Sequence, residues 1–221
     1  MNDPAPARSD RRWVRRKDAR PDEITAAALE LFVERGYANT RLEDVSARAG
    51  VSKGTVYLYF SNKEELFKAV VREGLVSPLL EMRDLVERFE GASIELLALL
   101  VRGWWSRIGS TRLSGIPKLM IAEARNFPEI ARFYVEEVVE PGQRTIARIV
   151  ERGIERGEFR AVDPREAAML ITAPMLVIML WRHSLACCIP AGSDVDPQAL
   201  IEAHLEAIRR ALARDAAPRT G

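Results

Sequence analysis

Cysteine is scarce in this sequence, and its two cysteines, Cys187 and Cys188, are adjacent. An adjacent pair cannot form the disulfide framework that stabilises small secreted proteins. The first twenty residues are rich in arginine and precede no apolar run, so they lack the pattern of a secretory signal. The most apolar stretch, residues 167–181, is shorter than the roughly 20 residues that cross a bilayer, and we interpret it as a buried helix. These absences predict a cytoplasmic protein without membrane contact.

The sequence also has almost no net charge, because 33 lysines and arginines face 32 aspartates and glutamates. A formal charge of +1 argues against a protein that coats nucleic acid through bulk charge, although it leaves room for a local basic surface. Hydrophobic residues make up 48% of the 221 residues, which is enough to fill a packed core. The length fits one large domain, or a small domain joined to a medium one.

Motifs of enzyme chemistry are missing as well. The sequence contains no nucleophile elbow, phosphate-binding loop or metalloprotease helix, so we expect no enzymatic activity and no cofactor. His183, Cys187 and Cys188 have the spacing of one helix face, which is compatible with a metal or redox site. No second cluster completes such a site, so we interpret these residues as small buried groups and expect no bound metal.

Helical periodicity runs through almost the whole chain, without alternating strands or hairpin dipeptides. We therefore predict an all-α fold. Three short helices, residues 21–67, form a small N-terminal domain, and the longer helices of residues 68–214 form a larger C-terminal domain. Residues 1–20 are expected to form a flexible basic arm, and residues 215–221 a tail. Pro78 is expected to kink or break the fourth helix. Later helices are expected at residues 93–108, 116–125, 128–140, 141–157, 163–188 and 197–214.

The arm carries three acids, Asp3, Asp10 and Asp18, and seven basic residues, which are Arg8, Arg11, Arg12, Arg15, Arg16, Lys17 and Arg20. Two interpretations of this pattern stay open. The arm is either a solvated terminus, or a basic segment that touches DNA phosphates or a minor groove.

Three short helices follow the arm, and their ends carry local signals. Gly36 is a typical stop for the first helix. Thr40 and Glu43 match a capping box at the start of the second helix, and Ser61 and Glu64 match another at the start of the fourth. Short helices with such defined ends are typical of a compact DNA-binding unit.

Residues 50–52 form the turn of a helix-turn-helix, whose second helix would lie in the major groove with its first residues at base edges. Lys53 offers a positive donor, Gly54 lets the backbone approach DNA, and Thr55 offers a hydroxyl and a methyl. Candidates for phosphate contacts are the hydroxyls of Tyr57 and Tyr59, and Thr40 and Lys63 at helix N-termini.

The stretch TRLEDVSARAGVSKGTVYLYFSNKEELF, residues 40–67, resembles the DNA-binding signature of TetR/AcrR-type regulators. Val45 and Ser46 replace the usual Ile-Ala pair, and Tyr59 stands where many members have histidine. The positions that match are Thr40, Ala49, Gly50, Val51, Ser52, Gly54, Tyr57, Phe60, Lys63 and Leu66. The resemblance implies phosphate contacts from Thr40, Tyr57, Tyr59 and Lys63. It implies base or near-base contacts from Ser52, Lys53, Gly54 and Thr55. Core positions would be Val45, Ala49, Val51 and Phe60.

The C-terminal part, around residues 118–160, is similar to the ligand-binding and dimerisation domain of many AcrR-like members. This similarity does not identify the ligand. Large adaptable side chains there suit a pocket for an apolar or amphipathic effector. The same side chains would equally form ordinary core. These candidates are Trp104, Trp105, Met120, Phe127, Phe133, Tyr134, Met175, Met179 and Trp181.

A homodimer is expected, because one recognition helix buries too little surface for tight specific binding. The last two long helices are the best candidates for its interface, through a four-helix bundle. The alternative is that their apolar stripes pack within one chain. The candidate interface residues are Met169, Leu176, Leu180, Ser184, Leu200, His204, Leu205, Ile208 and Leu212.

Taken together, the residues and the resemblance predict a sequence-specific DNA-binding regulator, with an operator, a second copy and an unknown small molecule as partners. Repression on a ligand-sensitive operator is implied by the family resemblance. Two alternatives stay open. One is a nonspecific DNA-binding protein that uses the basic arm, and the other is a small-molecule binder whose helix-turn-helix is vestigial.

Overall fold

The computed structural model describes residues 21–188 and 196–214. Within these residues it contains helices and no strand, apart from one isolated bridge between Phe159 and Ala213. The predicted all-α fold is therefore confirmed. The two interpretations of the basic arm concern residues 1–20, which lie outside the described part of the chain.

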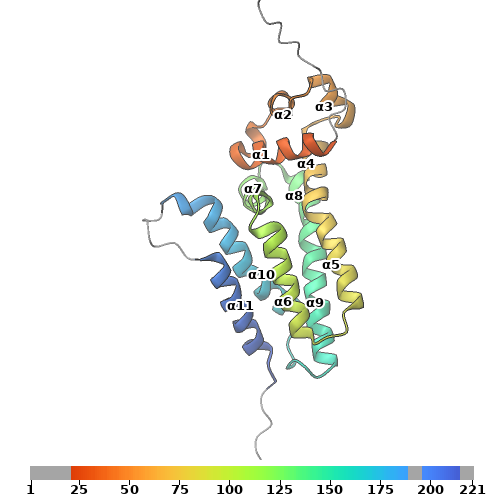
Figure 1. Ribbon diagram of the computed structural model, residues 1–221, viewed down its shortest axis with the longest axis vertical. Coiled ribbons are helices and arrows are strands. Elements are labelled where there is room, and N and C mark those ends of the chain that lie inside the picture. Colours follow the sequence, from red (N-terminus) through yellow and green to blue (C-terminus); the bar gives the residue numbers. More distant parts are fainter. Residues whose placement is uncertain (1–20, 189–195, 215–221) are drawn as a thin grey trace, which may run out of the picture.

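The first four helices gather at one end of the molecule (Figure 1). They are α1 (Pro21–Asn39), α2 (Leu42–Arg48), α3 (Lys53–Tyr59) and α4 (Lys63–Val71). Gly36 leaves the helical conformation at φ 84°, as expected of a stop signal, although a last turn continues to Asn39. The long helices extend away from this end, and α10 and α11 lie together along one side (Figure 1).

The remaining α-helices are separated or continued by short segments of 3-10 helix, which is narrower than an α-helix, or of π-helix, which is wider. Four of these turns are π-helical, η1 (Arg72–Val76), η2 (Trp105–Gly109), η4 (Val135–Val139) and η5 (Trp181–Leu185). The other elements are α5 (Ser77–Arg88), α6 (Ser93–Trp104), η3 (Arg112–Ser114), α7 (Gly115–Glu123), α8 (Pro128–Tyr134), α9 (Glu140–Glu155), α10 (Pro164–Leu180), η6 (Ala186–Cys188) and α11 (Pro197–Leu212).

Two hydrophobic clusters hold the fold together. The upper core joins the first four helices to α7 and α8, and aromatic rings cross that junction. Tyr37 of α1 packs edge-on against Phe67 at 5.4 Å and against Phe127 at 4.7 Å between ring centroids. The lower core joins α6, α9, α10 and α11. Because the upper core is shared, the DNA-binding helices are packed directly onto the helices beyond residue 67.

Pro78 was expected to kink or break the fourth helix, and the expected break is wrong. Helix α4 runs through η1 into α5, and Pro78 lies in the first turn of α5. A π turn precedes the proline, and at its end the Ser77 N–H and hydroxyl both bond to the Arg72 carbonyl. The DNA-binding end and the long helices are thereby joined by one continuous helical segment.

Both predicted capping boxes were wrong. Arg41 is the N-cap of α2, and the Thr40 hydroxyl instead donates to the Gly36 carbonyl at 2.8 Å. At α4 the cap is Asn62, whose side chain accepts from the Glu65 N–H at 2.9 Å. Each helix starts one residue later than its motif suggested, and at α2 the reason is that the Thr40 hydroxyl caps the end of α1.

Helix α10 with η5, residues Pro164–Leu185, is the one described helix that is long and apolar enough to cross a membrane by length and composition alone. Only 28% of its most apolar window is buried, so the expectation of a buried helix over residues 167–181 holds for one side of the helix only. Its uncovered side includes Leu170 and Val177, which are 71% and 58% exposed. Cys188 is also exposed rather than buried, and the described residues contain no cluster suited to a metal.

Candidate nucleic-acid interface and ligand cavity

The start of α3 is held by its own cap. The Ser52 side chain accepts from the Thr55 N–H at 3.1 Å, and the Ser52 and Thr55 hydroxyls lie 2.8 Å apart. Val56 is fully buried and Phe60 nearly so, which anchors the opposite side of the helix. The first residues of α3 are therefore presented outward in a fixed orientation, as the sequence predicts for a reading helix.

Gly50 sets the angle between α2 and α3. Its φ is +69°, a left-handed conformation that glycine adopts at little cost. The Gly50 N–H bonds to the Ala47 carbonyl and the Val51 N–H to the Ser46 carbonyl at 2.9 Å, which closes the end of α2. Val51 then packs against the upper core. The fold thus explains why a glycine and a valine occupy positions 50 and 51 of the turn.

The outward face of α3 is rich in groups that suit DNA. Lys53 and Gly54 are exposed, and Tyr57 and Tyr59 are 45% and 44% exposed. Leu58 is the most exposed large apolar side chain of the described residues, at 77%. Sequence reasoning missed Leu58, although its place between buried Val56 and Phe60 would have turned it outward on a helix.

Lys53 is already paired before any DNA arrives. Its ammonium contacts the Glu43 carboxylate of α2 and lies 5.6 Å from the centre of the Tyr57 ring. The hydrogen bond from Lys53 lowers the pKa of Glu43, and the same bond raises the pKa of Lys53. A base or phosphate must therefore share Lys53 with Glu43, or replace that carboxylate.

Thr40 and Lys63 lie on the same end of the molecule but face inward. The Lys63 ammonium donates to the Tyr37 and Ala38 carbonyls at 2.7 and 3.1 Å and lies over the Tyr37 ring. Burial lowers the pKa of Lys63. Thr40 is 1% exposed and caps the carbonyl of Gly36. Both side chains finish the end of α1, so their predicted phosphate contacts would have to come from neighbouring main-chain N–H groups.

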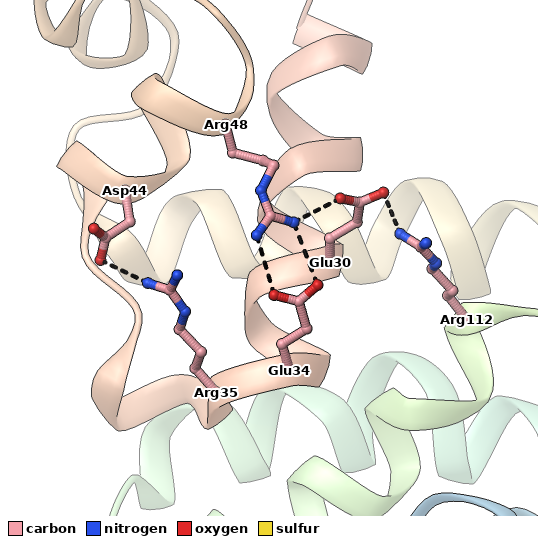
Figure 2. Close-up of polar contacts among 6 residues, drawn as sticks. All are labelled: Glu30, Glu34, Arg35, Asp44, Arg48 and Arg112. Carbon is pink, nitrogen blue, oxygen red and sulfur yellow. Dashed lines mark hydrogen bonds and ion pairs between the residues drawn. The ribbon is translucent and has the colours of Figure 1, made fainter.

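The helix-turn-helix is not itself a basic surface. Residues 21–67 contain five lysines and arginines against eight aspartates and glutamates. Figure 2 shows two of these cations, Arg35 and Arg48, paired with carboxylates of the protein. Arg48 of α2 contacts Glu30 at 2.8 Å and Glu34 at 3.1 Å on α1, and Glu30 also contacts Arg112 of η3. This Glu30 cluster ties α2 to α1 and α1 to the second domain.

A cavity of about 330 Å³ lies among α5, α6, α9 and α10. Its volume is in the range of small-molecule sites, and its wall is mostly apolar. Four of the predicted ligand residues line it, namely Trp104, Tyr134, Met175 and Met179. Wall residues that the sequence did not single out include Leu75, Leu79 and Met82 of the α4–α5 segment and Val138, Thr145 and Ile146 of the helix that follows Tyr134.

Five of the predicted ligand residues lie elsewhere, because packing rather than helix periodicity decides which neighbour a side chain meets. Trp105 is buried in the lower core, and Met120 and Phe133 are buried in the upper core. Phe127 packs edge-on against Tyr37. Trp181 is 45% exposed and turns away from the cavity wall. The alternative interpretation, ordinary core, fits Trp105, Met120 and Phe133, whereas Phe127 is only partly buried and Trp181 is exposed.

The predicted dimer residues fall into a buried group and a group with exposed surface. Leu205, Ile208 and Leu212 are buried in the lower core of their own chain, so their assignment to an interface was wrong. Those that keep an open surface are Met169, Leu176, Leu180, Ser184, Leu200 and His204, although Met169 and Leu176 also line the cavity. Exposed residues that the sequence missed on the same helix are Leu170, Val177 and Leu185.

Comparison with known proteins covers both halves of the chain. Residues 24–70 match the model of bacterial regulatory proteins of the tetR family, and residues 95–186 match the tetracyclin repressor-like C-terminal domain. The chain is 31% identical over 149 residues to the uncharacterized HTH-type transcriptional regulator YfiR of Bacillus subtilis, covering 67% of this chain and 72% of that protein. It is 29% identical to the fatty acid metabolism regulator protein of the same species, covering 70% and 80%.

Solved structures agree on the fold. The regulator FadR of Bacillus subtilis, crystallised with stearoyl-CoA, superposes with a TM-score of 0.70 at 23% identity, covering 87% of this chain and all of that one. A TetR-family regulator from Mesorhizobium loti gives 0.63 at 28% identity, covering 86% and 93%. The predicted family and function class are thus confirmed: the chain belongs to the TetR family of helix-turn-helix transcriptional regulators, which bind DNA and respond to ligands.

Proposed function

We propose that this protein is a homodimeric repressor that leaves its operator when an apolar acyl compound fills the cavity. The observation that carries the proposal is the cavity wall. Leu75, Leu79 and Met82 belong to the helical segment that continues from α4, so a ligand in the cavity touches the same segment that carries the DNA-binding end. A ligand that fits one orientation of this segment better than another changes DNA affinity by that difference in affinity.

The acyl nature of the ligand is supported by two facts. The wall is lined by aliphatic, aromatic and thioether side chains, which favour a hydrocarbon chain. A relative at 29% identity is named as a fatty acid metabolism regulator. These facts point to a medium or long hydrocarbon chain as the bound portion.

Two copies would pair through the uncovered sides of α10 and α11. Leu170, Val177, Trp181 and Leu185 recur at helical spacing along α10 and η5, and each is at least 45% exposed. Leu200 on α11 is 40% exposed beside them. Val177→Asp is expected to convert the dimer to monomer in analytical ultracentrifugation, because it places a charge in the apolar interface. Val135→Asp is the control, since Val135 is exposed on η4, outside α10 and α11.

The repressor proposal is tested by selecting bound DNA from a random pool and then adding acyl-CoA thioesters and free fatty acids of graded length. Release of the selected DNA by a subset of chain lengths is expected. Gly142→Leu should abolish release, because Gly142 lines the cavity and a side chain there takes up its space. Ala26→Leu adds similar bulk at an exposed position of α1 and should release DNA normally. Release from the Gly142 variant at wild-type ligand concentrations would contradict the proposal.

The two alternatives predict different results in the same assays. A nonspecific DNA-binding protein that relies on the arm would select no consensus and would lose all binding when residues 1–20 are removed. A vestigial helix-turn-helix would bind ligand but no DNA. Because residues 21–67 carry more acidic than basic groups, we expect the arm to add affinity and salt dependence to a specific complex without creating the specificity.

A further inference from the structure

Few polar groups reach the ligand cavity. The side chains with polar atoms in its wall are Trp104, Arg107, Tyr134, Gln143, Thr145 and Thr172. In a site so apolar, each unpaired polar group has a strong influence on which ligand fits, because a buried donor without an acceptor is costly. The partners of these six groups therefore restrict the chemistry of the ligand.

Most of these groups are already satisfied within the protein. The Thr145 hydroxyl donates to the Pro141 carbonyl at 2.9 Å. The Gln143 amide donates to the Thr172 hydroxyl at 2.7 Å, and that hydroxyl in turn donates to a main-chain carbonyl of α10. Arg107 pairs with Glu81 of α5, and both side chains are more than half exposed, so this pair lies at the outer edge of the cavity.

Tyr134 is different. Among the described residues its hydroxyl has no hydrogen-bond partner, although the ring packs against the upper core and the residue lines the cavity. Burial strongly raises the pKa of Tyr134, so the phenol stays protonated and remains a donor at any ordinary pH. The indole N–H of Trp104, across the cavity wall on α6, also has no partner within the described chain.

We propose that Tyr134 selects the effector by donating a hydrogen bond to an uncharged acceptor, the carbonyl of a thioester, ester or ketone, while the hydrocarbon chain fills the cavity. An ionised carboxylate is disfavoured at this position, because among the described wall residues the only cation is Arg107 at the exposed edge, already paired with Glu81. The proposal rests on the proposed function, and it adds the chemical class of the group that the cavity recognises.

The test uses a matched pair of ligands, undecan-2-one and undecane, whose binding to the full-length protein is measured by calorimetry. In Tyr134→Phe the affinity for the ketone should fall about two- to tenfold, which corresponds to one neutral hydrogen bond. The affinity for undecane should stay within about twofold. Tyr37→Phe is the control, because Tyr37 is also buried but lies outside the cavity, and it should leave both affinities unchanged.

The outcomes separate this inference from the proposed function. If both ligands bind and release DNA, but Tyr134→Phe leaves the ratio of their affinities unchanged, the role of Tyr134 is refuted and the repressor proposal stands. A change in that ratio in Trp104→Phe instead would assign the selection to the indole N–H and also refute it. If neither ligand binds the wild-type protein, the inference about Tyr134 fails, and the repressor proposal is decided by the acyl-CoA and fatty acid series. Tighter binding of the undecanoate anion than of the ketone would overturn the preference for an uncharged group.

Discussion

Gly54→Ala should make the protein more stable and its DNA complex weaker. Gly54 is the second residue of α3, is exposed, and has ordinary helical geometry. An added Cβ would meet only the Ser52 Oγ, at 3.8 Å, which is normal van der Waals contact. The free protein therefore has no steric reason to prefer glycine here. The reason must lie in something that approaches this face, and the proposed occupant is DNA.

The magnitudes follow from these contacts. Replacing glycine by alanine within a helix stabilises by about 0.5–1 kcal/mol, which for a domain of this size raises the melting temperature by about 1–4 °C. At the DNA surface the methyl group keeps the backbone from its closest approach and weakens about one base contact in each half-site, at about 1–3 kcal/mol each. For a dimer the operator affinity should fall about thirtyfold or more.

Thermal unfolding and operator binding at fixed salt measure the two effects on the same sample. Gly50→Ala is the matched control, because a Cβ added there would meet no atom within 4 Å, but the φ of Gly50 is +69°. That variant should lose about 1–2 kcal/mol of stability from backbone strain alone. Wild-type operator affinity in Gly54→Ala would refute the placement of DNA against the start of α3. A melting temperature below that of the wild type would refute the argument that the fold itself tolerates alanine.

Three further changes test other parts of the structure. Lys63→Met should lower stability by about 1–3 kcal/mol, measured by chemical denaturation, because two carbonyls at the end of α1 lose their donor; an unchanged midpoint would contradict this role. Arg112→Ala should change stability by less than about 0.5 kcal/mol. It should weaken ligand-induced DNA release, because it removes the contact between η3 and Glu30. Full DNA release from this variant would contradict a role for that contact. Burial, with Arg182 and Lys118 nearby, lowers the pKa of His183. The folded state therefore binds fewer protons than the unfolded state as the pH falls. Stability that is present above about pH 6.5 should be lost at lower pH. His183→Asn should remove the contribution of His183 to this acid-induced loss of stability, as measured by melting curves taken at several pH values.

The helix-turn-helix could be predicted because its signals are local. Gly50 is required by a left-handed turn, Ser52 caps α3, and Val56 and Phe60 fill the small core, so each choice is visible within a few residues. The errors there were shifts in cap position. Arg41 rather than Thr40 starts α2, because the Thr40 hydroxyl bonds to the Gly36 carbonyl and is not available as a cap. Asn62 rather than Ser61 caps α4.

The ligand cavity could be predicted only in part, because it depends on contacts between distant segments. Helix periodicity shows that Trp104 and Trp105 belong to one helix, but not that Trp104 meets the cavity while Trp105 meets the lower core. Leu75 and Leu79 were missed since they belong to a segment that was expected to break at Pro78. The same lack of long-range information placed Leu205 in an interface rather than in the core.

The π turns offer a physical route from the cavity to the DNA-binding end. Residues of η1, η2 and η4 all line the cavity, as Leu75, Ile108 and Val138 show. Because a π turn carries an altered hydrogen-bond register, a one-residue change in η1 would shift α4 along its axis by about 1.5 Å relative to α5. Helix shifts of about 1–2 Å are enough to repack interfaces in switching proteins, and hydrogen bonds to bases tolerate much less than that. We therefore expect an effector to release DNA through a small change in the α4–α5 segment, without a large rotation of either domain.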